Sequence, residues 1–173
     1  MSTEDLPGTQ GFRKGILFLL SGPAGSGKST LLRRALDEDG NLAFSISCTT
    51  RSAREGEVDG KDYHFLSDEE FSKRVENNEF LEHAEVHKWQ YGTLSNAVVD
   101  ILNDGKDVIM DIDVQGADQV RDSKDPVISD ALVDIFLTTS NTAELEKRLR
   151  GRGSEDEDTF QLRMQTALDE IKR

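Results

Sequence analysis

The sequence predicts an α/β domain organised around a mainly parallel β-sheet. Short apolar runs that are typical of strands alternate along the chain with longer segments of helical character. Strands that alternate with helices favour βαβ units, in which each helix carries the chain back to begin the next parallel strand. The 173 residues are 35% hydrophobic, which is enough to bury the core of a single domain.

The first elements follow a polar segment over residues 1–14, which we expect to be a flexible tail. The apolar run ILFLL predicts a strand over 16–20, and LLRRAL belongs to a helix expected over about 28–36. The stretch FSISCTT, residues 44–50, is rich in β-forming side chains and predicts the next strand. After a charged loop, YHFL at 63–66 resumes strand character.

The middle of the chain carries clear start and stop signals. Ser67 and Glu70 have the spacing of a capping box, so a helix is predicted over SDEEFSKRVENN. The run FLEHAEV, residues 80–86, predicts a strand. The segment SNAVVDILNDG predicts a short helix that Gly105 stops, because glycine is favoured just past a helix end.

The remaining elements are two apolar strands and two helices. DVIMDID, residues 107–113, predicts a strand that ends in carboxylates, and LVDIFLTT, residues 132–139, predicts another strand of the buried type. The segment NTAELEKRLRGRG predicts a helix with opposite charges four residues apart. Those pairs are Glu144 with Arg148 and Glu146 with Arg150. A last helix is expected from about residue 156 onward.

Charge restricts the partners of this chain. There are 34 acidic and 21 basic residues, which give a formal net charge of -13. Such a surface repels a polyanion, so nucleic acid is excluded as an expected partner. A small phosphorylated ligand remains compatible, because a few converging cations and backbone amides can hold it inside an acidic molecule.

Cysteine content and hydropathy indicate a soluble protein of the cytoplasm. The single Cys48 excludes an internal disulfide, and we expect it to pack as a small apolar residue. No apolar run approaches the roughly 20 residues of a membrane span, and MSTEDLPGTQ lacks the layout of a signal peptide. A membrane is therefore not an expected partner.

The stretch SGPAGSGKST between the first strand and the first helix matches the phosphate-loop pattern. Glycines let consecutive N–H groups point into a concavity, and the following helix adds the positive end of its dipole. Lys28 is expected to reach the terminal phosphates, and the Ser29 hydroxyl is a candidate ligand of Mg2+. The predicted residues of this nucleoside-triphosphate site, which is an ATP site if the protein is an ATP-dependent kinase, are Gly22, Pro23, Ala24, Gly25, Ser26, Gly27, Lys28, Ser29 and Thr30.

The alternative is an ordinary glycine-rich turn, but the strand, the spacing, the lysine and the serine all occur together. A phosphate loop alone does not separate a GTPase, an ATPase motor and a small-molecule kinase. The late part of the chain has no Asn-Lys-x-Asp segment of the kind that reads guanine, which weakens the GTPase option. The distinction must therefore come from an acceptor site.

A candidate acceptor site begins with Arg51 and Arg54, three residues apart just after a strand, followed by Tyr63. Two guanidinium groups can grip one phosphate through paired hydrogen bonds, and a phenol hydroxyl can reach a remaining oxygen. The alternative is a solvated surface loop, which charge alone would favour. The loop thus needs a second feature to support a ligand.

Glu82, in EFLEHAEV, supplies that feature. A carboxylate can accept two parallel hydrogen bonds from the N1–H and N2–H2 edge of guanine, and adenine does not offer that edge. Taken alone, Glu82 also fits an ordinary surface carboxylate on a strand. Tyr91-Gly92-Thr93 follows soon after and adds two more hydroxyl groups.

Together and in this order, the segments resemble the guanylate kinase family. The segments that carry the resemblance are GPAGSGKST, SISCTTRSAREGEVDGKDYHF, NNEFLEHAEVHKWQYGT, VIMDIDVQG and LEKRLRGRG, and they span about residues 16–163. The resemblance implies a P-loop nucleoside-monophosphate kinase fold, in which helices flank a parallel sheet beside a GMP-binding subdomain and a mobile lid. It implies Mg2+- and ATP-dependent phosphorylation of GMP to GDP, with dGMP as a further acceptor to test.

The resemblance also implies how the chain is divided. After the tail, one guanylate-kinase-like domain is expected over 15–173. Its core is expected at 15–46 and 95–140, its GMP-binding subdomain at about 47–94, and its lid at about 141–163. Family members continue with a further strand and a closing helix, so an exposed sheet edge is expected where that strand is lacking.

Site residues follow from the resemblance position by position. The implied ligands of the GMP phosphate are Arg51, Arg54, Tyr63 and Tyr91, and the implied guanine contacts are Ser47, Glu82 and Thr93. Lid arginines that would close over the triphosphate are Arg148, Arg152 and Arg163, whereas Arg150 is expected to be a surface residue paired with Glu146. With Lys28, Arg51 and Asp111, the lid arginines make up the expected catalytic set.

Asp111 and Asp113 alternate along VIMDID, so both side chains are expected to point the same way at the carboxyl end of the strand. Such a pair can orient Mg2+-bound water and the arginines of the acceptor site, and Asp113 is counted among the GMP contacts. The alternative is that Asp113 caps the next helix. A general base is not required, because a phosphate oxygen of GMP is already a competent nucleophile.

Two other functions stay open at this point. The first is a catalytically inactive guanylate-kinase-like module that uses its GMP subdomain to bind proteins, although the intact Lys28 and Ser29 argue against it. The second is a kinase for a different small acceptor, which would leave the arginines and Glu82 without a joint purpose. His64, His83 and His87 lack ligand spacing, so they do not predict a metal site.

Overall fold

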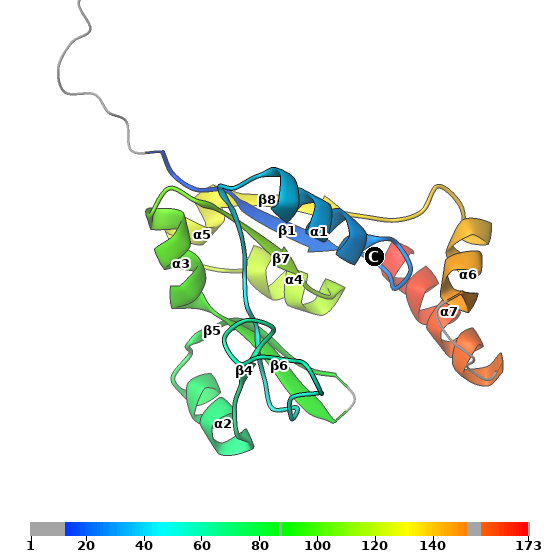
Figure 1. Cartoon of the computed structure of the whole chain (residues 1–173), viewed down its shortest axis with the longest axis horizontal. Coiled ribbons are helices and arrows are strands. Elements are labelled where there is room, and N and C mark those ends of the chain that lie inside the picture. The colour runs from blue at the N-terminus through cyan, green and yellow to red at the C-terminus, as the bar shows by residue number, and fades with distance from the viewer. Residues whose placement is uncertain (1–12, 87, 152–156, 173) are drawn as a thin grey trace, which may run out of the picture.

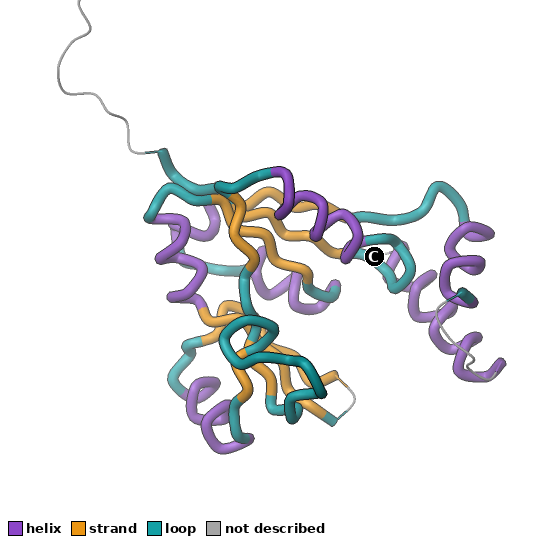
Figure 2. Tube along the Cα trace, in the orientation of Figure 1, coloured by secondary structure: helices purple, strands orange, loops and turns teal. Residues whose placement is uncertain are grey.

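A computed structural model describes residues 13–86, 88–151 and 157–172 of the chain. Its strands form two separate groups, each with helices of its own, and a pair of helices stands apart from both (Figures 1 and 2). The expected tail over 1–14 lies almost wholly outside the described residues. Within the described part of the chain, no helix is long and apolar enough to cross a bilayer.

The first group is a parallel sheet of four strands in the order β2-β7-β1-β8. The strands are β1 (Leu17–Ser21), β2 (Leu42–Phe44), β7 (Asp107–Asp111) and β8 (Leu132–Phe136). Leu17 aligns with Val108 of β7 on one side and with Leu132 of β8 on the other. The predicted α/β fold with a parallel sheet is confirmed.

Apolar faces of the helices cover this sheet and form the main core. These helices are α3 (Ser95–Asn103), α4 (Val114–Arg121) and α5 (Pro126–Ala131). The helix α1 (Lys28–Glu38) also lies beside this sheet, but none of its residues is buried. Fully buried residues of the core are Leu17, Leu19 and Val108 from the strands, Val98 from α3 and Ile128 from α5. Each such side chain contributes about 1.5–3 kcal/mol relative to exposure, so this core fixes the ends of β1 and β7, where the site begins.

Two strand predictions need correction. β8 was expected to be buried, yet it is one of the two outer strands of the sheet, and Val133 and Phe136 are each 41% exposed. The stretch FSISCTT was expected to form one strand, but it divides between β2 and β3 (Cys48–Thr49), which belong to different sheets. Pairing with distant strands, rather than local propensity, decides both outcomes.

The second group is a mixed sheet in the order β4-β3-β6-β5. Besides β3 it contains β4 (His64–Phe65), β5 (Phe80–Val86) and β6 (Trp89–Leu94), and β5 pairs with β6 in antiparallel fashion. The helix α2 (Asp68–Glu76) packs on this sheet through Phe71, whose ring stacks on Phe80 at 4.4 Å. Its predicted capping box is confirmed, because the Ser67 and Glu70 side chains each accept the other's backbone N–H.

The helices α6 (Thr142–Arg150) and α7 (Glu157–Lys172) stand apart from both sheets (Figure 1). A small core of Leu145, Leu149, Phe160 and Ala167 joins the two helices. The predicted pairs are confirmed, with Arg148 at 2.8 Å from Glu144 and Arg150 at 3.1 Å from Glu146. Arg150 also pairs with Glu157 and lies 3.7 Å above the Phe160 ring, which fastens α6 to α7.

Candidate active site

The phosphate loop connects the end of β1 to the start of α1. Gly22, Gly25 and Gly27 have φ of +136°, +84° and +107°, a region in which other residues are strained. A Cβ at Gly22 would lie 2.1 Å from the carbonyl oxygen of Leu137, so only glycine fits there. The N–H of Ser26 donates to the Pro23 carbonyl at 3.2 Å, which closes the turn. The sequence therefore produces a tight loop at a helix N-terminus, the geometry that binds phosphate.

Lys28 lies folded across this loop. Its Nζ donates to the carbonyl oxygens of Gly22 at 2.5 Å and Pro23 at 3.3 Å. Its charge also reaches Asp111 at the end of β7, whose pKa is raised by burial and partly lowered by Lys28. The ammonium group and the Asp111 carboxylate thus belong to the same local electrostatic environment.

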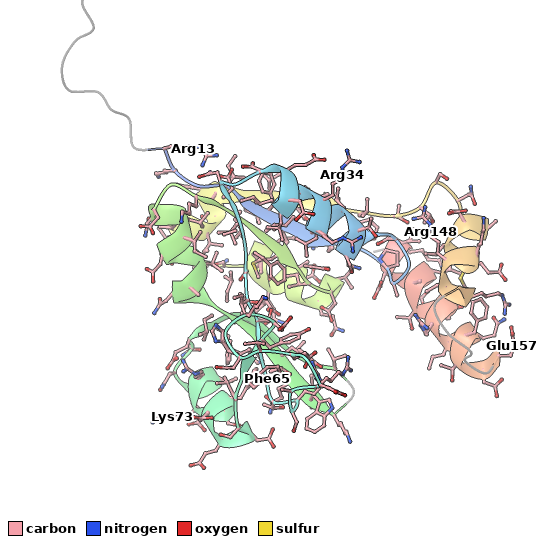
Figure 3. All side chains as sticks on the ribbon, in the orientation of Figure 1. Arg13, Arg34, Phe65, Lys73, Arg148 and Glu157 are labelled. Atoms are coloured by element: carbon pink, nitrogen blue, oxygen red, sulfur yellow. The ribbon has the colours of Figure 1, made fainter. Side chains whose placement is uncertain are left out.

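Arg148, one of the arginines predicted to belong to a lid, contacts the loop directly. Nη1 of Arg148 donates to the Ser26 carbonyl at 3.2 Å, while its Nε donates to Glu144. Figure 3 shows Arg148 on the side of α6 that faces the loop. A cavity of about 610 Å³ opens here, lined by Gly25, Ser26, Gly27, Thr30, Leu31, Arg34, Arg148 and Gly151. Arg163 lies on α7 and makes contacts of its own, and Arg152 lies outside the described residues.

The end of α7 adds a carboxylate that sequence reasoning missed. Burial raises the pKa of Glu170, Lys28 lowers it and Asp113 raises it. These influences place Glu170 within electrostatic reach of the phosphate loop. No local pattern in the sequence indicates this, because it depends on the end of α7 lying beside the start of α4, where Glu170 and Val114 line one cavity.

The second sheet presents Arg51, which is only 8% exposed. Its guanidinium forms two parallel hydrogen bonds with Glu57, and it lies 5.4 Å from the centre of the Tyr63 ring. The hydrogen bonds that Arg51 donates to Glu57 raise the pKa of Arg51 and lower the pKa of Glu57. Arg54 is exposed, and its backbone N–H donates to Glu57 at 2.8 Å. Sequence reasoning missed Glu57, although its position three residues after Arg54 was a usable signal.

Glu82 lies on β5 with only 6% of its surface exposed. Burial raises the pKa of its carboxyl, hydrogen bonds from Thr93 lower it, and the charge of Asp113 raises it. Ser47 and Thr93 bring their hydroxyl oxygens to 3.3 Å of each other nearby. A buried carboxylate with few partners is well suited to accept hydrogen bonds from a ligand.

A cavity of about 170 Å³ gathers most of the predicted acceptor residues. Its walls are Ser47, Tyr63, Glu82, Ala84, Val86, Tyr91, Asp111, Ile112 and Asp113. Tyr63 and Tyr91 meet there edge to face, with ring centres 6.0 Å apart. Side chains from the second sheet therefore share one cavity with the end of β7 from the first.

Asp113 has two relationships in this region. Its Oδ1 accepts from the backbone N–H groups of Gln115 at 2.9 Å and Gly116 at 2.8 Å, so it caps α4. Capping was the alternative function considered for this residue. The side chain also lines the cavity beside Asp111, so the cap holds a carboxylate at the cavity wall.

Two side chains, at the start of α1 and at the end of β7, offer oxygen ligands of the kind that Mg2+ binds. Ser29 offers an exposed hydroxyl at the start of α1, and Asp111 offers a half-buried carboxylate. Both are hard oxygen ligands of the kind that Mg2+ prefers, usually together with water and substrate phosphates. Within the described residues, no group of three or more His, Cys, Asp or Glu side chains gathers to hold a metal by itself. These residues fit a Mg2+ ion that arrives with a nucleotide.

Comparison with known proteins agrees with this geometry. The family model described as guanylate kinase matches residues 14–173. The chain belongs to the guanylate kinase family. A guanylate kinase of Desulfotalea psychrophila is 48% identical over 158 residues, covering 91% of this chain and 76% of that protein. One from Ruegeria sp. (strain TM1040) is 45% identical over 159 residues, covering 92% of this chain and 72% of that protein.

A solved structure gives the same result for the fold of this guanylate kinase family member. The crystal structure of guanylate kinase from Anaplasma phagocytophilum superposes with a TM-score of 0.68 at 32% sequence identity. The match covers 93% of this chain and 72% of the other. The recognised family and the nucleoside-monophosphate kinase fold are therefore confirmed.

Proposed function

We propose that this chain transfers the terminal phosphoryl group of ATP to GMP and so forms ADP and GDP. The observation that carries the proposal is the cavity in which Glu82 and the two tyrosines share walls with Asp111. The positive charge of Lys28, at the end of the phosphate loop, acts in turn on Asp111 and lowers its pKa against the effect of burial. An acceptor site and a donor site thus adjoin across the ends of two sheets.

On the donor side, the loop amides and the N-terminus of α1 would hold the phosphates of ATP. Lys28 would leave the Gly22 carbonyl and reach the terminal phosphates, since its ammonium already lies over the loop. Ser29 and Asp111 would hold Mg2+, which neutralises phosphate charge when it is bound. The cavity beside Arg34 and Arg148 is the available space for the rest of the donor nucleotide.

On the acceptor side, Glu82 would accept the two hydrogen bonds that the guanine edge donates. Ser47 and Thr93 would contact the same base through their paired hydroxyls. Arg51, Arg54, Tyr63 and Tyr91 would bind the phosphate of GMP, with Arg51 held in place beforehand by Glu57. Adenine offers no pair of donors at that edge, so Glu82 would select guanine.

Transfer requires little chemistry beyond positioning. An oxygen of the GMP phosphate forms a bond to the γ-phosphorus while the bond to the bridging oxygen of ADP breaks. Lys28 and the lid arginines Arg148, Arg152 and Arg163 would stabilise the negative charge spread over the transferred group. Closure of α6 and α7 would exclude water, which would otherwise take the phosphoryl group.

The test is ADP release from ATP and Mg2+ with GMP, dGMP, AMP or UMP as acceptor. We expect rapid ADP release with GMP and slow release with AMP and UMP. The rate with dGMP shows how far the acceptor site depends on the 2′-hydroxyl of the sugar. Lys28→Ala is the control that should remove the activity while leaving the fold intact. Release that does not depend on GMP, or that is as fast with AMP, would overturn the proposal.

A further inference from the structure

Gln119 connects the two sheets through a contact that the proposed mechanism does not use. It lies on α4, which follows β7 of the parallel sheet, and it is exposed to solvent. Its side-chain amide reaches His83 on β5 of the second sheet. The N–H of His83 donates to Oε1 of Gln119 at 3.0 Å, and Nε2 of Gln119 donates to the His83 carbonyl at 2.9 Å.

This pair of bonds resembles the pairing of one strand with another. A carboxamide carries one acceptor and an N–H donor, the same groups as a peptide unit. β5 is an outer strand of its sheet, and among the described strands only β6 pairs with it. The side chain of Gln119 therefore pairs with the main chain of His83 as a neighbouring strand would. His83 directly follows Glu82 on β5.

The same helix also contacts the side chain of Glu82. Gly116 lies three residues before Gln119, so both project from one side of α4. A Cβ at Gly116 would lie 2.9 Å from Oε2 of Glu82 and 3.5 Å from its Cδ. The absence of a side chain at Gly116 therefore gives the carboxylate its place against the helix.

From these contacts we propose that Gln119 is a positioning residue for base recognition. It holds the β5 main chain against α4, and in that way it fixes the Glu82 carboxylate at the cavity wall. The inference rests on the proposed function, in which Glu82 reads the guanine edge. Without the clamp, β5 can shift relative to Asp111 and Asp113, and the two hydrogen bonds to guanine lose their alignment.

The test compares GMP with IMP, which has the same sugar and phosphate but lacks the 2-amino group. The ratio of their kcat/KM values measures the contribution of the hydrogen bond from the 2-amino group to Glu82. Because both values come from the same enzyme sample, the ratio does not depend on the fraction of enzyme that is active. Gln119→Met keeps the length of the side chain and removes both bonds to His83. We expect this variant to reduce the GMP-to-IMP ratio about 3- to 10-fold, which is the size of one or two misaligned hydrogen bonds.

Two further variants make the test specific. Gln165→Met removes an exposed glutamine of α7 that pairs with Asp169, and it should leave the ratio unchanged. Gln119→Glu retains an acceptor for the His83 N–H but cannot donate to the carbonyl, so it should lower the ratio in the same direction. If Gln119→Met is not recovered in a folded form, Gln119→Glu alone tests the inference.

The outcomes separate this inference from the proposed function. A wild-type protein that transfers no phosphoryl group to GMP overturns the proposed function itself. A wild-type protein that prefers GMP over IMP, with the same ratio in both Gln119 variants, overturns this inference alone. A wild-type protein that phosphorylates GMP and IMP equally well contradicts base reading by Glu82, and the positioning proposal with it.

Discussion

Arg51 and Glu57 meet through two parallel hydrogen bonds, from Nη1 to Oε2 at 3.0 Å and from Nη2 to Oε1 at 2.8 Å. The same Nη1 also donates to the Ser52 carbonyl at 2.9 Å. A nearly buried guanidinium is thus oriented before any nucleotide binds. The carboxylate that orients the guanidinium also offsets its charge, so the proposed binding of the GMP phosphate would use the N–H groups that Glu57 leaves available.

Replacement of Arg51 should therefore reduce the affinity for GMP by more than the loss of one exposed cation would. Arg51→Ala removes a proposed phosphate ligand and leaves the Glu57 carboxylate without its guanidinium partner beside the proposed phosphate position. We expect the GMP KM to rise, kcat to fall and kcat/KM to drop by about 30-fold or more, as measured by steady-state ADP release. Arg121→Ala removes an arginine that pairs with Asp134 on the surface, and it should have little effect. Equal effects of the two changes would remove the phosphate role of Arg51.

Lys28 should matter for the rate rather than for the fold. Its ammonium contacts loop carbonyls in this structure, so Lys28→Met removes two hydrogen bonds within the loop and no packing of the buried core. We expect kcat to decrease by about 100-fold or more, because one stabilising donor to the transferred group is lost. Circular dichroism and the thermal midpoint should stay close to the wild-type values. A Lys28→Met enzyme with normal kcat would show that another cation serves the terminal phosphate.

Glu82 should set the preference for guanine over adenine. Glu82→Gln keeps the shape of the side chain but replaces one acceptor with a donor, which then faces the donor edge of guanine. We expect kcat/KM for GMP to fall and the GMP-to-AMP ratio to decrease about 10-fold or more. Glu85→Gln, on the same strand but exposed, is the matched control. Unchanged selectivity in Glu82→Gln would refute the role of this carboxylate.

The burial of Glu82 also predicts a gain of stability in the same variant. Burial raises the folded-state pKa of Glu82, so the folded protein holds this proton more tightly than the unfolded chain does. Stability then falls as pH rises from the unfolded pKa of about 4.3 through the raised folded value. Glutamine imitates the neutral form, so Glu82→Gln should unfold at a higher temperature than wild type at pH 7. This difference should shrink as pH falls through that window, and a difference that grows toward low pH would contradict the sign.

Features that depend on local spacing could be predicted from the sequence. The phosphate loop needs glycines, a lysine and a serine at fixed positions between a strand and a helix, and all are consecutive in the chain. The capping box of α2 is local in the same way. Glu82, Tyr63 and Tyr91 are distant in sequence, and their meeting in one cavity was inferred through the family resemblance rather than from the residues alone.

Features that depend on tertiary pairing could not be predicted in this way. FSISCTT has the composition of one strand, yet Phe44 pairs with β7 and Cys48 pairs with β4 and β6. The polar segment WQYGTL forms β6 because β5 and β3 lie on either side of it. The two hydrogen bonds between Gln119 and His83 join the helix α4 to β5 of the second sheet, and no periodicity marks them.

The central claim is that one chain passes a phosphoryl group directly from ATP to GMP. Phosphorus NMR of a mixture of ATP, GMP and Mg2+ with purified protein measures this transfer without a coupling enzyme. The account predicts that the GMP signal is replaced by GDP and the ATP signal by ADP in equal amounts, and that inorganic phosphate does not accumulate. Conversion of ATP to ADP and inorganic phosphate with GMP unchanged would contradict it.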